Sequence, residues 1–203
     1  MFRLIIAGAA CALCLVASPA AAEPFRNFVD MCLDTNIDRQ AAGGRAKAKG
    51  WFSLPVDPAV EYEAELEDAA LFLSVDPQTM SEKDFESLEM LITGWGAGEQ
   101  VFDVAGVRMD ACVVVSPSAE AADLSDRLED MLGFGSTAID GVPAWAFSRV
   151  GSGFRSEADA VQSADDDPEA LRRLAGERKI YVAGVIEEEG MTGLMLAALR
   201  SDR

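Results

Sequence analysis

The side chains that could carry out chemistry in this chain are limited in kind, because its 203 residues include no histidine. Ser-His-Asp and Cys-His catalytic sites both use an imidazole to move a proton, so neither can form here. The sequence also lacks a G-x-x-x-x-G-K-[ST] phosphate loop and a C-x-x-C-H haem attachment motif. Serine–lysine catalysis is not formally excluded, but none of the four lysines follows a serine at the S-x-x-K spacing. A carboxylate pair is a further route to catalysis, and the 35 Asp and Glu residues offer too many candidates to choose one.

Acidic segments that resemble metal sites are better explained as helix caps. Asp34, Asn36 and Asp38 match the first three ligand positions of an EF-hand loop, but Arg39 stands where that loop requires glycine. Residues 165–167 are all Asp and could bind Ca²⁺, yet acids just before a proline are an ordinary helix start. We therefore predict no catalytic residue, no cofactor and no metal site from these motifs.

Two weaker motifs contain glycine, and arginine accompanies it in the second. Gly94, Gly96 and Gly98 lack the spacing of a dinucleotide-binding loop, and they predict a flexible turn. Arg149 and Arg155 flank a glycine-containing loop that follows an expected strand. An ordinary solvated loop is the default interpretation, and an anion site at these two arginines is the alternative.

The first 22 residues have the features of a secretory signal peptide. Arg3 precedes a charge-free apolar run, which is followed by Pro19 and three small alanines. We predict cleavage between Ala22 and Glu23, and hence a periplasmic or secreted protein. The alternative is an uncleaved anchor helix, because the charge-free stretch is nearly long enough to span a bilayer.

Two cysteines, Cys32 and Cys112, remain after such a cleavage. An exported protein with two cysteines most often joins them in one disulfide, which we predict here. The alternative is two buried thiols that pack as small apolar groups. A disulfide would require the first helix to lie against the strand that contains Cys112, because the two Cα atoms must come close together.

The charge of the chain limits its partners. With 35 acidic and 17 basic residues its net charge is −18, which repels nucleic acid and anionic membrane surfaces. We expect no nucleic-acid partner and no stable membrane insertion after cleavage.

Helical periodicity dominates the first half of the chain. Apolar residues recur at helical spacing from Phe25 to Leu33, and small residues mark a second helix that ends at Gly50. Asp57 and Pro58 predict the start of a third helix, which we extend to about residue 70, and a fourth continues to about residue 92. The expected buried stripe of the second helix is Ile37, Ala41, Gly44 and Ala48.

Strand periodicity dominates the second half. One helix is expected after Pro117, ending at Gly133, and another after Asp167 and Pro168. The expected strands are 101–104, 111–115, 144–150, 180–186 and 192–199, the last two joined as a hairpin.

These elements predict an α+β fold, with N-terminal helices packed on a mainly antiparallel sheet of about five strands. We expect a signal peptide at 1–22 and a single α+β domain at 23–203. Its helical half covers about 23–93 and its sheet-rich half about 99–203.

The order of the expected elements forms a pattern: an early helix with Phe28 and Cys32, then a small-residue helix that ends at Gly50 and Trp51, then a strand around Cys112. This pattern resembles small secreted bacterial proteins with one cysteine pair and no assigned function. The resemblance implies one disulfide-bonded periplasmic domain and no functional residues.

Two functions follow as hypotheses. The first is a non-enzymatic binding protein, whose partner is an unknown protein or an envelope component. The alternative is a carboxylate-based hydrolase that acts on a glycan or a cell-wall polymer.

Overall fold

The computed structural model describes residues 19–55, 67–97, 105–139, 141–164, 167–188 and 190–201. Its strands are β1 (Phe52–Leu54), β2 (Glu67–Leu73), β3 (Met90–Ala97), β4 (Val107–Ser116), β5 (Thr137–Ile139), β6 (Val142–Val150), β7 (Gly153–Ser156), β8 (Ile180–Glu188) and β9 (Met191–Ser201). They form one nine-stranded sheet in the order β1-β2-β3-β4-β9-β8-β6-β5, with β7 added beside β6. Every pairing in the sheet is antiparallel.

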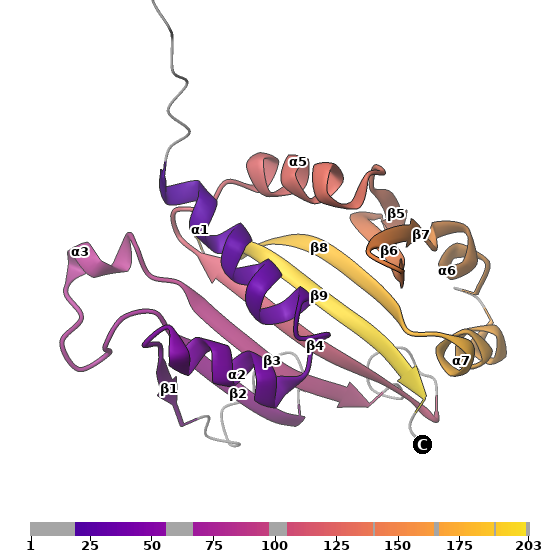
Figure 1. Ribbon diagram of the computed structural model, residues 1–203, viewed down its shortest axis with the longest axis horizontal. Coiled ribbons are helices and arrows are strands. Elements are labelled where there is room, and N and C mark those ends of the chain that lie inside the picture. Colours follow the sequence, from indigo (N-terminus) through magenta and orange to yellow (C-terminus); the bar gives the residue numbers. More distant parts are fainter. Residues whose placement is uncertain are drawn as a thin grey trace, which may run out of the picture.

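Helices cover the sheet unequally (Figure 1). They are α1 (Pro19–Phe28), the π-helical turn η1 (Val29–Leu33), α2 (Arg39–Ala48), α3 (Glu82–Phe85), α5 (Ala121–Leu132), α6 (Ala158–Ala164) and α7 (Pro168–Glu177). The first two helices, η1 and α5 bury the main core against one face, where Phe28, Leu128 and Leu196 are almost fully buried. Smaller clusters join α6 and α7 to alternate residues of the same strands, such as Ile180 and Leu199.

Local sequence signals account for three of the helix ends. Asp38 caps α2, because its side chain accepts a hydrogen bond from the backbone nitrogen of Ala41 at 2.8 Å. Asp167 caps α7 in the same way, and Pro168 is the first residue of that helix. Gly133 ends α5 with a φ of 81°, a left-handed conformation that glycine adopts without strain.

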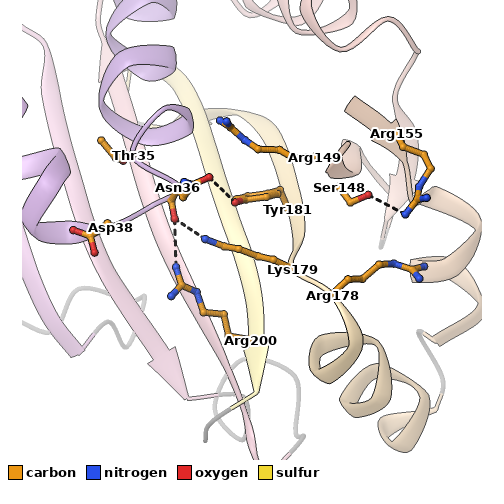
Figure 2. Close-up of a pocket in the computed structure, with 10 residues that line it drawn as sticks. All are labelled: Thr35, Asn36, Asp38, Ser148, Arg149, Arg155, Arg178, Lys179, Tyr181 and Arg200. Carbon is orange, nitrogen blue, oxygen red and sulfur yellow. Dashed lines mark hydrogen bonds between the residues drawn. The ribbon is translucent and has the colours of Figure 1, made fainter. Parts of the chain in front are cut away.

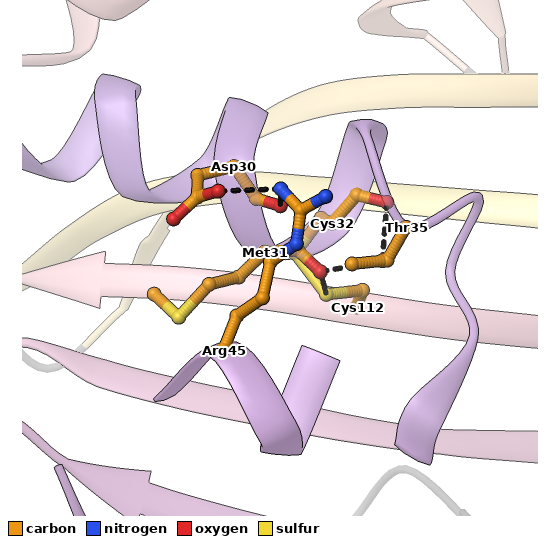
Figure 3. The surroundings of a disulfide bond; sticks show 6 residues. All are labelled: Asp30, Met31, Cys32, Thr35, Arg45 and Cys112. Carbon is orange, nitrogen blue, oxygen red and sulfur yellow. Dashed lines mark hydrogen bonds and ion pairs between the residues drawn. A yellow bond between two sulfur atoms is a disulfide. The ribbon is translucent and has the colours of Figure 1, made fainter. Parts of the chain in front are cut away.

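The predicted disulfide between Cys32 and Cys112 is confirmed (Figure 3). The two Cα atoms lie 5.5 Å apart, and both residues are fully buried in the main core. The bond fixes η1 to the middle of β4. This contact agrees with the expectation that the segment containing Cys32 lies against the strand containing Cys112. Around it, Thr35 Oγ donates hydrogen bonds to the carbonyl oxygens of Met31 and Cys32, at 2.6 and 3.1 Å.

The α+β class is correct, but the predicted number and distribution of elements are wrong. The sheet has nine strands rather than about five, and the helices that pack on it are not all N-terminal, because α5 and α7, the two helices expected in the second half, and α6 cover it as well. Residues 67–73 and 90–97 form β2 and β3, whereas helices were expected to about residue 70 and to about residue 92. Their register explains why: Phe72 pairs with Leu91, Leu91 pairs with Val114, and all three are buried in the same core.

A boundary between a helical and a sheet-rich half is therefore not found in the described part of the chain, because one sheet runs from β1 to β9. Gly94 and Gly96 lie within β3 rather than in a turn. In α2 the buried residues are Ala42, Gly43 and Ala46. Three residues of the predicted buried stripe are exposed instead: Ala41, Gly44 and Ala48.

Several sequence predictions fall outside the described residues. These are the strand at 101–104, the start of the third helix at Asp57, two of the three acids at 165–167, and most of the signal peptide. The expected cleavage point between Ala22 and Glu23 lies within α1. Among the helices that the structure describes, none combines the length and the apolar character that a membrane span requires.

Candidate anion-binding site

One end of the sheet carries a row of four basic side chains on neighbouring strands. Arg108 of β4 is the ladder partner of Arg200 on β9. Lys179 lies immediately before β8, whose first residue pairs with Leu199, so Lys179 is at the same level as Arg200. The last pair of the β6–β8 ladder is Phe147 and Tyr181. Arg149 lies two residues after Phe147 and Lys179 two residues before Tyr181, so these two basic residues are also at the same level. We call Arg108, Arg200, Lys179 and Arg149 the basic row.

Side-chain alternation places the basic row on the face that α1, η1 and α2 cover. Side chains two residues apart share a face of a strand. The residues two positions inward from the row are Phe147, Tyr181, Ala198 and Asp110, of which the first three belong to the main core. The row thus continues the core outward, at the point where apolar packing gives way to charge.

The loop between η1 and α2 lies over the basic row (Figure 2). The backbone carbonyl oxygen of Asn36 accepts hydrogen bonds from Lys179 Nζ at 2.6 Å and from Arg200 at 3.3 Å. The side-chain oxygen of the same residue accepts a bond from the Tyr181 hydroxyl at 2.9 Å. Arg149 donates to the carbonyl oxygen of Leu33 at 2.5 Å, at the end of η1.

This loop has an unusual backbone. Asn36 and Ile37 both have a positive φ, 56° and 60°. Asparagine tolerates that region, but a β-branched residue adopts it only when the surroundings impose it. Several hydrogen bonds hold the loop in place: the Ile37 nitrogen donates to the carbonyl oxygen of Cys32 at 2.9 Å, the Asn36 nitrogen donates to that of Leu33 at 3.0 Å, and the basic row binds Asn36.

The basic row has too few carboxylates to neutralise it. Asp110 is nearly buried and pairs with both Arg108, at 2.8 Å, and Arg200. The ion pairs found between described residues involve neither Arg149 nor Lys179. Like charges on neighbouring strands destabilise a sheet, and Asp110 offsets that repulsion at Arg108 and Arg200 but not at Arg149 and Lys179.

A second basic cluster adjoins the row. Glu157 is nearly buried and accepts hydrogen bonds from Ser148 at 2.6 Å, Arg155 at 2.8 Å and Arg178 at 2.8 Å. Burial alone would raise the pKa of Glu157, but the hydrogen bonds from Ser148 and the two arginines outweigh it and lower that pKa. The carboxylate therefore stays ionised and holds two guanidinium groups with one negative charge. The Nε atom of Arg178 is buried without a hydrogen-bond partner among the described residues.

Both clusters line one hollow of about 670 Å³. This volume is in the range of small-molecule binding sites. With Arg108, the two clusters contain six basic side chains, and the carboxylates in or beside the hollow are those of Asp38, Asp110 and Glu157. This local excess of positive charge lies on a chain whose net charge is −18. The lining residues are Thr35, Asn36, Asp38, Ser148, Arg149, Arg155, Arg178, Lys179, Tyr181 and Arg200.

Lys179 has the most perturbed basic group in the hollow. Its partial burial lowers the pKa of the ammonium group to about 8, with help from the neighbouring charges of Arg200 and Arg149. Asp110 and Asp38 oppose this effect. The same burial raises the pKa of the Tyr181 hydroxyl, so that this group stays protonated and can donate a hydrogen bond.

The sequence hypothesis of an anion site at Arg149 and Arg155 pointed to part of this hollow, which both residues line. It missed Lys179, Arg200 and Asn36, which come from distant parts of the chain. The sequence does contain a pattern for the row: on or next to each of its four strands, a basic residue stands two positions from a core residue or from Asp110. That pattern has meaning only once the register of the strands is known.

The acidic motifs have the capping roles expected from the sequence where the structure describes them. Asp38 caps α2 and also lines the hollow, and Asp167 caps α7. No cluster of three metal-ligating side chains occurs within the described ranges. The chain matches no protein-family model, no curated protein and no solved structure.

Proposed function

We propose that this chain is a binding protein for a small organic anion that carries a phosphate or a carboxylate group. The observation that supports the proposal is the basic row, whose Arg149 and Lys179 have no carboxylate partner in the described part of the chain. A bound anion would supply the missing negative charge. It would also offset the repulsion between like charges on adjacent strands.

The chemistry of the lining supports this ligand class. Guanidinium groups present planar pairs of donors that match carboxylate and phosphate oxygens. The hollow is lined by four arginines and one lysine, and Tyr181 is its one aromatic residue among those described. A positive hollow on an acidic chain also attracts small anions while the rest of the surface repels polyanions.

The carboxylate hydrolase has less support. Hydrolysis of a glycosidic bond needs two carboxyl groups at a defined separation. Among the described residues that line the hollow, Asp38 is the one carboxylate, and it is engaged as a helix cap. We retain export as part of the proposal, because the leader features and the disulfide both suit an oxidising compartment.

Isothermal titration calorimetry tests the proposal. Sulfate, citrate and glucose 6-phosphate should bind, and glucose should not. Arg200→Met and Arg149→Met should each weaken binding by roughly tenfold, the value of one charge-assisted hydrogen bond. Arg173→Met is the matched control, because Arg173 is exposed on α7 and does not line the hollow.

Thermal unfolding of each variant would verify that it is folded before titration. Absence of heat with every anion in the folded wild-type protein would overturn the proposal. Equal weakening by Arg173→Met would also overturn it, since the effect would then come from overall charge rather than from the hollow.

A further inference from the structure

We propose that Lys179 forms a reversible imine with the bound ligand, which would then be an anionic aldehyde or keto acid. The inference rests on the proposed anion site and identifies its ligand class more closely. It starts from the position of the amine within the hollow rather than from the charge of the row.

Lys179 is the one lysine that lines the hollow, and it lies between two arginines of the basic row. Its amine reaches the Asn36 carbonyl oxygen beneath the loop, at 2.6 Å. Figure 2 shows the side chain extending from the start of β8 toward that loop, beside Tyr181 and Arg200. A ligand whose acid group lies on Arg149 or Arg200 would therefore bring its carbonyl group close to this amine.

The lysine also has the protonation state that such a reaction needs. A lysine becomes nucleophilic when burial or a neighbouring cation favours its neutral form. Both causes act here: partial burial, followed by the charges of Arg200 and Arg149, lowers the pKa of Lys179 to about 8, while Asp110 and Asp38 oppose them. A useful fraction of the amine is then neutral near pH 7.5.

The reaction balances without a further reagent. The neutral amine attacks the carbonyl carbon, and a proton moves from nitrogen to the former carbonyl oxygen to give a carbinolamine. Loss of that hydroxyl group as water leaves a C=N bond between the ligand and Nζ. The Tyr181 hydroxyl, which stays protonated, can give its proton to the departing oxygen and regain one from the nitrogen, so that a neutral imine and water result; addition of water reverses the sequence.

Reductive trapping tests this inference. Pyridoxal 5′-phosphate serves as the anionic aldehyde, borohydride reduces any imine to a stable secondary amine, and peptide mass spectrometry locates the label. Lys179 should be labelled at least about tenfold faster than the exposed Lys47, Lys49 and Lys83, because its amine has a lowered pKa and lies beside the proposed anion site. Pyridoxal without its phosphate should show no such preference, and sulfate should slow the labelling of Lys179.

Lys179→Arg separates the two proposals, because it retains a cation but has no amine. It should still bind sulfate by calorimetry and lose the label. If the wild-type protein binds sulfate but Lys179 is labelled no faster than Lys83, the imine is overturned and the anion site stands. If sulfate does not bind, and the phosphate gives no advantage in labelling, both proposals fail.

Discussion

Lys179 and Arg200 donate hydrogen bonds to one atom, the backbone carbonyl oxygen of Asn36. Two cationic donors thus meet on a neutral acceptor, in a loop whose backbone has a positive φ. An anion in the hollow would be a stronger acceptor for both donors than a carbonyl oxygen is. The Asn36 loop is therefore both a support of the basic row and the group that competes with the proposed ligand.

Asn36→Asp tests this competition with a substitution of nearly the same shape. The new carboxylate would lie beside Lys179, Arg200 and the Tyr181 hydroxyl, where it would supply the missing charge. We expect the variant to be more stable than the wild type by roughly 1 kcal/mol, and to bind sulfate at least about tenfold more weakly. Thermal unfolding and calorimetry measure the two effects.

Asn36→Gly is the companion variant, because it retains the backbone carbonyl and tolerates the positive φ. It should bind sulfate nearly as the wild type does. A gain in stability by Asn36→Asp without a loss of affinity would show that the basic row serves only to hold the loop.

The affinity for sulfate should fall as the pH rises through about 8. Lys179 is charged below its pKa of about 8 and neutral above it, and the lowering comes from burial first and then from Arg200 and Arg149. Sulfate retains its charge over this range, so a change in affinity reports on the protein. Between pH 7 and 9 we expect a loss of about fivefold, near 1 kcal/mol for one partly screened charge.

Lys179→Arg should bind sulfate with little change from pH 7 to 9, because arginine stays charged. Lys179→Met should bind sulfate weakly at both pH values. A fall of the same size in Lys179→Arg would assign the pH dependence to another group.

The parts of the fold that the sequence predicted correctly are those with local signals. Asp167 and Pro168 start α7, Gly133 ends α5, and the apolar runs of β8 and β9 form the expected hairpin. The pairing of Cys32 with Cys112 was predicted by counting, since no other cysteine lies beyond the predicted signal peptide.

The missed strands had misleading local signals. Residues 67–73 follow an acidic, alanine-containing segment of good helix formers. They nevertheless form a strand, because Phe72 and Leu73 pair with β1 and β3 in the sheet. Propensity is a weak guide where tertiary packing supplies most of the stability. The basic row was hidden for the same reason, because Arg108 and Arg200 become neighbours only through the β4–β9 register.

Replacement of both cysteines by serine should destabilise the protein without abolishing its fold. The disulfide closes 80 residues of sequence, and its loss should reduce the free energy of unfolding by roughly 2–4 kcal/mol. Affinity for sulfate should fall as well, because the disulfide fixes η1 to β4, and the backbone carbonyl of residue 32 in η1 holds Ile37 beside Asn36. Denaturant unfolding and calorimetry on Cys32→Ser/Cys112→Ser measure both effects.

The wild-type protein, unfolded without reductant, should release no thiol from these two positions. Two free thiols in that experiment would contradict the disulfide. Unchanged sulfate affinity in the folded double variant would show that the Asn36 loop does not depend on it.

Glu89 should lower the stability of the protein at neutral pH. Its side chain is 7% exposed and accepts a hydrogen bond from Asn27 at 2.5 Å. Burial raises its pKa above the usual value, and the nearby charge of Glu23 adds to this, whereas the Asn27 bond, Lys49 and Arg26 act in the opposite direction. The folded state therefore holds the proton to higher pH than the unfolded chain does.

The sign of the effect follows from linkage. Below the pKa of the unfolded carboxyl both states are protonated, and the full contribution of the neutral group to stability is present. As the pH rises toward the folded pKa, the unfolded chain gives up its proton first, so stability is lost through that window and stays lost above it. Glu89→Gln removes the titration while retaining an acceptor for Asn27.

Glu89→Gln should therefore be more stable than the wild type at pH 7, and the difference should shrink as the pH is lowered through about 4. Urea unfolding at a series of pH values measures the free energy of unfolding of both proteins. Glu86→Gln, at an exposed position three residues earlier, is the control and should show a much smaller change. A Glu89→Gln variant less stable than the wild type at pH 7 would mean that the ionised carboxylate is favourable in the fold. The interactions with Asn27 and Lys49 would then outweigh the burial that raises the pKa.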